Sequence, residues 1–237
     1  KRNLMPGMLG WFKMTASTTV EDIEWLMARS ASYNAGFAFV TDLNTVRQNG
    51  ASDEIFSILN TWENARLEGK FSTTLMERMK PLENEFKLKK TGTGELWLTP
   101  VYSYKFTHDK KILQPGQPAH STFFIENKAA DQPLRFIITA LDETVSGIRI
   151  ELNGAKTLEI PVILEKGQTL KYTEGSEAIL YDHHWQIVRK IPVNASLLQC
   201  AAGKHQVQVD ARFGGTNEAP KLKLEFLFFG TAEKLEK

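Results

Sequence analysis

Aromatic, acidic and imidazole side chains are concentrated at residues 181–185, which read Tyr-Asp-His-His-Trp, and Tyr172 precedes them closely. Flat aromatic rings stack on the apolar faces of sugar rings, while carboxylates and imidazoles hydrogen-bond to hydroxyl groups. The run therefore predicts a weak sugar-binding site formed by Tyr172, Asp182, His184 and Trp185. The alternative is that Trp185 and Tyr181 fill the core of the β-sandwich, since a single tryptophan in a strand usually packs inside.

Asp42 is the candidate catalytic carboxylate, because it follows the apolar run at residues 37–40 directly. Active sites of β/α barrels gather at the C-terminal ends of such strands. Glycoside hydrolysis needs a second carboxylate nearby, and no partner is identifiable at the end of the other expected strand. The alternative is that Asp42 caps a turn together with Asn44.

Other catalytic and ligand-binding motifs are missing from the sequence. There is no G-x-S-x-G nucleophile elbow, and residues 92–94 (Gly-Thr-Gly) lack the third glycine of a phosphate-binding loop. The five histidines include no H-x-x-x-H pair, and Cys200 is the single cysteine. The sequence therefore predicts no metal site and no cofactor.

The composition is that of a globular protein. The chain has 237 residues, of which 42% are hydrophobic, and a formal net charge of +1. This balance argues against nucleic acid as a partner, and no apolar run is long enough to predict a membrane span. The sequence begins at Lys1 without a signal-peptide core or an initiator methionine, so we expect a piece of a longer polypeptide.

The elements that would position these residues differ between the two parts of the chain. Residues 1–90 show helical periodicity, with a helix starting at a capping box at residues 18–21 and stopping near Gly36. Parallel strands are expected at residues 9–14 and 37–40. A second helix should begin at residue 52 or 53, and a third at residue 72, which Pro81 kinks or ends before residues 83–88.

From residue 91 the pattern changes to short runs in which apolar and polar residues alternate, separated by glycine and proline. About eleven such runs predict an antiparallel β-sandwich of jelly-roll type over residues 91–237, with a clear hairpin turn at Asn153-Gly154. The expected fold class is thus α+β with two domains: a mostly helical, partial-barrel β/α segment at 1–90, followed by the β-sandwich.

Two groups of short segments are distinctive in their order. In the front part they are residues 8–12 (Met-Leu-Gly-Trp-Phe), 21–29 (Glu-Asp-Ile-Glu-Trp-Leu-Met-Ala-Arg), 33–38 (Tyr-Asn-Ala-Gly-Phe-Ala) and 62–66 (Trp-Glu-Asn-Ala-Arg). In the tail they are residues 150–154 (Ile-Glu-Leu-Asn-Gly), 179–182 (Ile-Leu-Tyr-Asp) with Trp185, and 220–226 (Pro-Lys-Leu-Lys-Leu-Glu-Phe). Together they resemble the C-terminal region of large glycoside-hydrolase-like proteins of Bacteroidetes-type bacteria, in which the end of a (β/α)8 barrel precedes a β-sandwich.

This resemblance implies a periplasmic or extracellular bacterial protein whose partners are polysaccharide or oligosaccharide and the remainder of a longer polypeptide. A complete barrel takes roughly 250 residues and eight strands, so the family's catalytic strands would be absent and no catalytic residue is carried over. We therefore expect the C-terminal portion of a carbohydrate-active protein, not catalytic by itself, with the sandwich as an accessory or weak sugar-binding module. The alternative is a noncatalytic adhesion or scaffold module without a sugar site.

Overall fold

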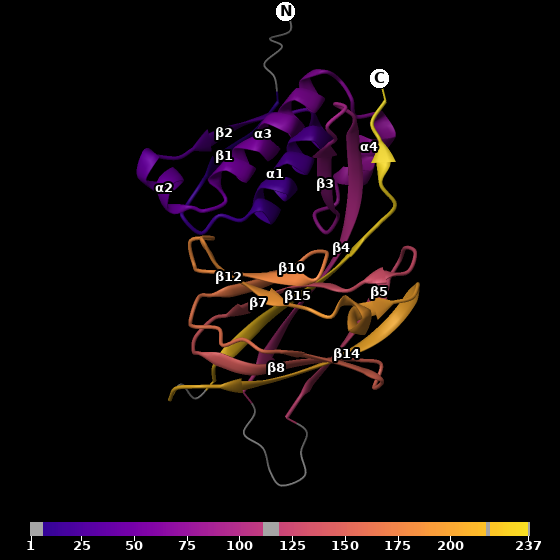
Figure 1. Cartoon of the computed structure of the whole chain (residues 1–237). Coiled ribbons are helices and arrows are strands. Elements are labelled where there is room, and N and C mark those ends of the chain that lie inside the picture. Colours follow the sequence, from indigo (N-terminus) through magenta and orange to yellow (C-terminus); the bar gives the residue numbers. More distant parts are fainter. Residues whose placement is uncertain (1–6, 111–118, 217–218, 237) are drawn as a thin grey trace, which may run out of the picture. The chain divides into compact units, whose positions relative to one another are not determined.

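The structure is a computed structural model that describes residues 7–110, 119–216 and 219–236. It divides into two compact units, most of whose helices and strands are labelled in Figure 1. Unit 1 comprises residues 1–101, 184–186 and 229–237, and unit 2 comprises residues 102–183 and 187–228. Each unit is therefore assembled from segments that are far apart in the sequence.

The expected fold class, with a mostly helical N-terminal segment, is wrong. The chain is mostly β, with 45% of its residues in strands and 21% in helices, and it contains several antiparallel sheets. The clearest departure is β3 (Glu85–Lys90), which pairs antiparallel with the beginning of β4 (Leu96–Asp109). Phe86 and Leu88 are buried between less buried lysines, and this period of two belongs to a strand. A helical reading of residues 1–90 overlooked that alternation.

Unit 1 combines four helices with short strands in the described part of the chain. The helices are α1 (Val20–Tyr33), α2 (Leu43–Gln48), α3 (Ser52–Leu67) and α4 (Thr73–Met79). β1 (Met8–Lys13) and β2 (Gly36–Val40) pair in parallel, whereas β3 and β16 (Glu233–Lys234) pair antiparallel with β4. α1 and α3 pack side by side (Figure 1), and the core between the helices and β3 includes Ile23, Ile55, Trp62 and Met79.

The helix ends of unit 1 follow local capping chemistry. α1 begins with a capping box, one residue later than expected: Thr19 accepts from the Asp22 amide, and Asp22 accepts from the Thr19 amide. It ends at Asn34, which adopts a left-handed conformation with φ 45°, and not at Gly36. α4 begins as expected at Ser72, whose hydroxyl accepts from the Leu75 amide. Local signals thus placed these helices to within a few residues.

Unit 2 is a β-sandwich, as expected for this part of the chain. One layer contains β12 (Ile187–Pro192), β11 (Glu177–Tyr181), β10 (Thr169–Tyr172), β7 (Arg135–Ala140), β15 (Lys221–Phe229) and the later residues of β4, in this order. The other layer contains β5 (Ser121–Asn127), β14 (Gly203–Phe213), β8 (Val145–Leu152) and β9 (Lys156–Ile160). The short strands β6 (Gln132–Pro133) and β13 (Gln199–Cys200) pair separately, and a 3-10 turn spans Ala195–Leu198.

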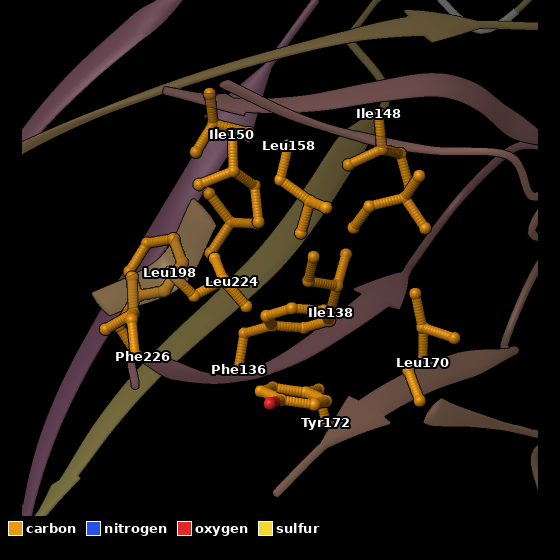
Figure 2. Close-up of a cluster of buried hydrophobic side chains, with 14 of the residues drawn as sticks. Phe136, Ile138, Ile148, Ile150, Leu158, Leu170, Tyr172, Leu198, Leu224 and Phe226 are labelled. Atoms are coloured by element: carbon orange, nitrogen blue, oxygen red, sulfur yellow. The ribbon is translucent and has the colours of Figure 1, made fainter. Parts of the chain in front are cut away.

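The core of unit 2 lies between these layers. Figure 2 shows Phe136, Ile138, Leu224 and Phe226 from the larger sheet packed with side chains of the smaller one, among them Ile150. The hairpin between β8 and β9 turns at Asn153 and Gly154, both with positive φ (53° and 68°), as the sequence predicted. None of the helices in the described ranges is both long and apolar enough to cross a membrane.

Candidate functional site

Tyr172 is a core residue of unit 2. It is 0% exposed, and its ring lies 5.5 Å from that of Phe136 (Figure 2). Its hydroxyl donates to the Gly175 carbonyl at 3.0 Å, and burial raises its pKa. A ring with no accessible face cannot stack on a sugar, so the environment of Tyr172 is that of a core residue.

Asp182 lies at the other end of the same hairpin. In the antiparallel pair of β10 and β11, Thr169 faces Tyr181, whereas Tyr172 lies next to the turn that connects the two strands. Because each residue advances a strand by about 3.3 Å, Asp182 and Tyr172 are separated by roughly the length of β10. Both belong to unit 2, while His184 and Trp185 belong to unit 1, so the four residues do not form one cluster within either unit.

Three hydrogen bonds hold the segment His184–Gln186 within unit 1. The Gly50 amide donates to the His184 carbonyl at 2.8 Å, Trp185 Nε1 donates to the Ser17 carbonyl at 3.0 Å, and Gln186 Nε2 donates to the Gln48 carbonyl at 2.9 Å. The polar edge of the Trp185 ring is therefore already committed to a main-chain acceptor, although the side chain remains partly exposed.

The backbone of this segment is unusually constrained. Trp185 has a φ of 62°, which is rare for a bulky side chain. A Cβ atom on Gly50 would lie 2.4 Å from the Trp185 carbonyl oxygen, so only glycine fits at position 50 without displacement. These features indicate that close packing against Gly50, and not only the chemistry of a ligand, constrains which residues can occupy this segment.

Asp42 is the exposed N-cap of α2, directly after β2. Its carboxylate accepts from the Thr45 amide at 2.9 Å and from the Thr45 hydroxyl at 2.8 Å. The hydrogen bond from the Thr45 amide and the one from its hydroxyl lower the pKa of Asp42. An ionised, capping carboxylate is suited to holding a helix end and unsuited to donating a proton as a general acid.

A polar groove in unit 1, with a volume of about 380 Å³, is the candidate binding site. Its walls come from α3, from the turn between β3 and β4, and from the C-terminal residues around β16. The polar side chains that line it are Asn60, Thr61, Asn64, Glu68, Lys70, Lys90, Thr93, Glu95 and Lys234, and its apolar surface comes from Ala65, Leu96 and Leu235.

Local structure explains how the helical wall of this groove is formed. Asn60 and Asn64 are four residues apart on α3 and share one face, with Asn64 Nδ2 donating to Asn60 Oδ1 at 3.1 Å. α3 ends at Leu67, Gly69 then adopts a φ of 67°, and the Lys70 amide donates to the Ala65 carbonyl at 3.0 Å. This is the hydrogen-bond pattern of a Schellman motif, and it turns Lys70 back along the helix into the groove.

The opposite wall is a hairpin joined to the C-terminal tail. The Thr91 amide donates to the Glu95 carbonyl at 2.9 Å, and Gly94, with a φ of 85°, completes the turn. Lys234 pairs with Trp97 in the sheet, which brings its ammonium group against the Glu95 carboxylate. That hydrogen-bonded ion pair lowers the pKa of Glu95 and raises the pKa of Lys234.

The sequence analysis missed this groove. Its walls meet only after Asn60, Glu95 and Lys234, which are widely separated in the chain, come together in space. The one visible signal was the Asn60 and Asn64 pair at helical spacing on α3. Within the described residues, no group of three or more histidine, cysteine, aspartate or glutamate side chains is arranged to hold a metal ion.

Glu24 is a second residue whose environment sequence reasoning did not anticipate. It lies in unit 1 and is only 6% exposed. Its Oε2 atom accepts from Trp62 Nε1 at 2.6 Å and from the Leu88 amide at 3.3 Å, so it links α1, α3 and the free edge of β3. Burial raises the pKa of Glu24 to about 7. The carboxylate does not line the groove, and its contacts are those of a structural link.

Comparisons with known proteins add little to this geometry. No protein-family model matches the chain, and no curated protein matches it. Among solved structures, the chain is similar to an isomalto-dextranase of Arthrobacter globiformis T6, complexed with panose, with 8% sequence identity and a TM-score of 0.22. The similarity covers 90% of this chain and 49% of that enzyme, so this chain spans about half of its length. At this TM-score the similarity supports no statement about the fold or activity of the present chain.

Proposed function

We propose that this chain is a noncatalytic, carbohydrate-binding part of a carbohydrate-active protein, with the polar groove of unit 1 as its binding site. The observation that carries the proposal is the mixture of groups in the groove: amides from Asn60 and Asn64, hydroxyls from Thr61 and Thr93, and both signs of charge. Sugar hydroxyls donate and accept hydrogen bonds at once, so a wall that offers both functions complements them.

The same composition argues for weak binding. The described lining of the groove contains no aromatic ring, so affinity would rest on hydrogen bonds that replace those made to water. Each such bond contributes about 0.5 to 1.5 kcal/mol net. A hydroxyl-rich ligand held by a few of them is expected to bind with a Kd in the millimolar range, about 4 kcal/mol.

The test is calorimetric titration of the whole chain with oligosaccharides chosen from a glycan panel. The double variant Asn60→Ala, Asn64→Ala should weaken binding by about fivefold or more, because two amide partners are lost. Asn44→Ala is the matched control, since Asn44 is an exposed asparagine of α2 in the same unit and does not line the groove. Equal binding by the double variant and the control would refute this location of the site.

A sugar contact at His184 and Trp185 stays a separate proposal, supported by the partial exposure of the Trp185 ring. Trp185→Phe keeps an aromatic plane and loses the bond to Ser17, whereas Trp185→Ala loses both. If Trp185→Ala reduces binding more than the groove variant does, while Trp185→Phe binds normally, the site lies at this segment and not in the groove.

The alternative function, an adhesion or scaffold module without a sugar site, is favoured by a different observation. β1 exposes large apolar side chains, with Trp11 81% exposed and Met8 58% exposed. Exposed apolar surface of this kind is typical of protein contacts. Failure of every glycan on the panel to bind would leave this alternative in place of the proposed function.

A further inference from the structure

We infer that the groove of unit 1 selects acidic saccharides, those that carry a carboxylate or a sulfate, over neutral ones. The inference rests on the proposed function and adds the chemical class of the ligand. Its basis is the distribution of charge within the groove: three lysines, Lys70, Lys90 and Lys234, face two carboxylates, Glu68 and Glu95.

The two carboxylates compensate the lysines unequally. Lys234 forms a direct hydrogen-bonded ion pair with Glu95, so each neutralises the other. Lys70 lies 3.8 Å from Glu68, at the outer limit of an ion pair, and 62% of the Glu68 side chain is exposed to water. Such a pair is screened and weak. The Lys70 charge therefore remains available to a ligand.

Lys90 has no ion-pair partner among the described residues. It is the last residue of β3, opposite Leu96 of β4, and it lines the groove next to the turn that contains Thr93. Lys70 approaches the same groove from the end of α3, with a side chain that is only 17% exposed. Two cationic groups on different elements thus face one hollow in which neighbouring amides and hydroxyls can hold the rest of a sugar ring.

Physical chemistry then favours an anionic ligand. A carboxylate or sulfate on the sugar would form charge-assisted hydrogen bonds, which are about twice as strong as neutral ones. Lysine is a flexible point charge and not a planar fork, so the groove is expected to accept either kind of anionic group.

The experiment compares matched ligands that differ only in having carboxylates where the neutral sugars have hydroxymethyl groups. Trigalacturonate and its neutral galactose counterpart form one pair, and a glucuronate trisaccharide with its neutral glucose counterpart forms the other. At an ionic strength of about 0.01 M, the acidic member of at least one pair should bind about fivefold or more tightly than the neutral member, and about 1 M salt should remove most of this preference.

Charge variants locate the preference in the groove. Lys90→Gln and Lys70→Met should each reduce the ratio of acidic to neutral affinity by about threefold, because only the acidic ligand loses a charge-assisted hydrogen bond. Lys89→Gln is the matched control, because Lys89 is exposed, adjacent and absent from the groove lining. Circular dichroism and urea unfolding of each variant check that the fold is retained.

The outcomes separate this inference from the proposed function. If neutral sugars bind and acidic ones bind no more tightly, the selectivity is refuted while the proposed function stands. If neither class binds, both are refuted. If Lys89→Gln lowers the ratio as much as Lys90→Gln, or if inorganic sulfate alone binds as tightly as the acidic saccharides, the preference is nonspecific and the inference is overturned.

Discussion

Glu24 shows at the scale of one residue how a buried carboxylate links three elements of unit 1. Its two hydrogen-bond donors do not offset the loss of hydration, and burial raises its pKa from 4.5 to about 7. The folded chain therefore holds the Glu24 proton more tightly than the unfolded chain does. The resulting stabilisation is complete below about pH 4.5 and is lost as the pH rises through about 7.

Glu24→Gln should for this reason stabilise the chain at alkaline pH relative to the parent, by an amount that approaches roughly 3 kcal/mol above pH 8 and vanishes near pH 4. The glutamine oxygen can still accept from Trp62 and Leu88. Urea unfolding across this pH range measures the difference. Glu54→Gln, an exposed change on α3, is the control and should leave the pH dependence unaltered. A parallel pH profile for the parent and Glu24→Gln would contradict the assignment.

Gly50 is the second residue for which the structure gives a specific prediction about stability. Gly50→Ala places a methyl group 2.4 Å from the Trp185 carbonyl oxygen, so the segment His184–Gln186 must shift and its hydrogen bonds must weaken. We expect a loss of about 2 kcal/mol or more in the free energy of unfolding, since backbone overlap cannot be relieved by side-chain rotation.

The control for Gly50→Ala is Gly92→Ala, because a Cβ atom at position 92 meets no other atom within 4 Å. That change should alter stability by less than about 0.5 kcal/mol. Chemical denaturation followed by tryptophan fluorescence compares the two variants. Equal stability of both would show that residues 184–186 are not packed against Gly50 in solution.

At the scale of elements, β10 illustrates why a residue type does not by itself mark a ligand site. Thr169, Leu170 and Tyr172 of this short strand are buried, and only Lys171 is partly open. β10 lies between β7 and β11 in the sheet, so both of its edges are hydrogen-bonded to neighbouring strands. The aromatic ring of Tyr172 packs in the core of unit 2 from this central strand.

Substitutions of Tyr172 should therefore act on stability. Tyr172→Phe should cost about 1 kcal/mol, because the hydroxyl bond to Gly175 is lost, whereas Tyr172→Ala should cost about 3 to 5 kcal/mol, because a cavity forms beside Phe136. Urea unfolding gives both values. Glycan titration of the Phe variant, which keeps its fold, should match that of the parent, and a selective loss of binding would restore Tyr172 as a sugar contact.

At the scale of the whole molecule, each unit is assembled from segments that are far apart in the sequence, so no single cut in the chain separates the two units. The chain passes between the units after residues 101, 183, 186 and 228. Residues 1–101 alone would lack β16, Lys234 and the segment that bonds to Ser17 and Gly50. Binding and activity should therefore be measured on all 237 residues and not on a fragment of them.

The complete chain is expected not to hydrolyse glycosides. Asp42 is an exposed N-cap whose pKa is lowered by its bonds to Thr45, which leaves it unsuited to the acid role. Glycoside hydrolysis requires a protonated acid in addition to an ionised carboxylate, and no second carboxylate is paired with Asp42 in the sequence pattern. Release of product from chromogenic glycosides by the purified chain measures this. Activity that disappears in Asp42→Asn and persists in Asp53→Asn, an exposed control on α3, would make Asp42 a catalyst.

The features that could be predicted from the sequence alone are those that depend on residues close to one another in the chain. Alternation of apolar and polar residues predicted the strands of unit 2, Asn153-Gly154 predicted a hairpin, and Ser72 predicted the start of α4. These succeeded because turn conformation, capping and the two faces of a strand are set within a few residues. The same reasoning failed at residues 85–90, where the alternation of Phe86 and Leu88 was not recognised as a strand.

Tertiary structure decided which of the chemically suggestive residues are accessible and which of them meet. The sequence could not show that Tyr172 is fully enclosed, that Glu24 lies between Trp62 and the edge of β3, or that Lys234 reaches the turn at Glu95. Burial and long-range proximity depend on how sheets and helices from distant segments pack, and local periodicity carries no record of that packing. The groove exists only because residues from α3, the β3–β4 turn and β16 are brought together by the fold.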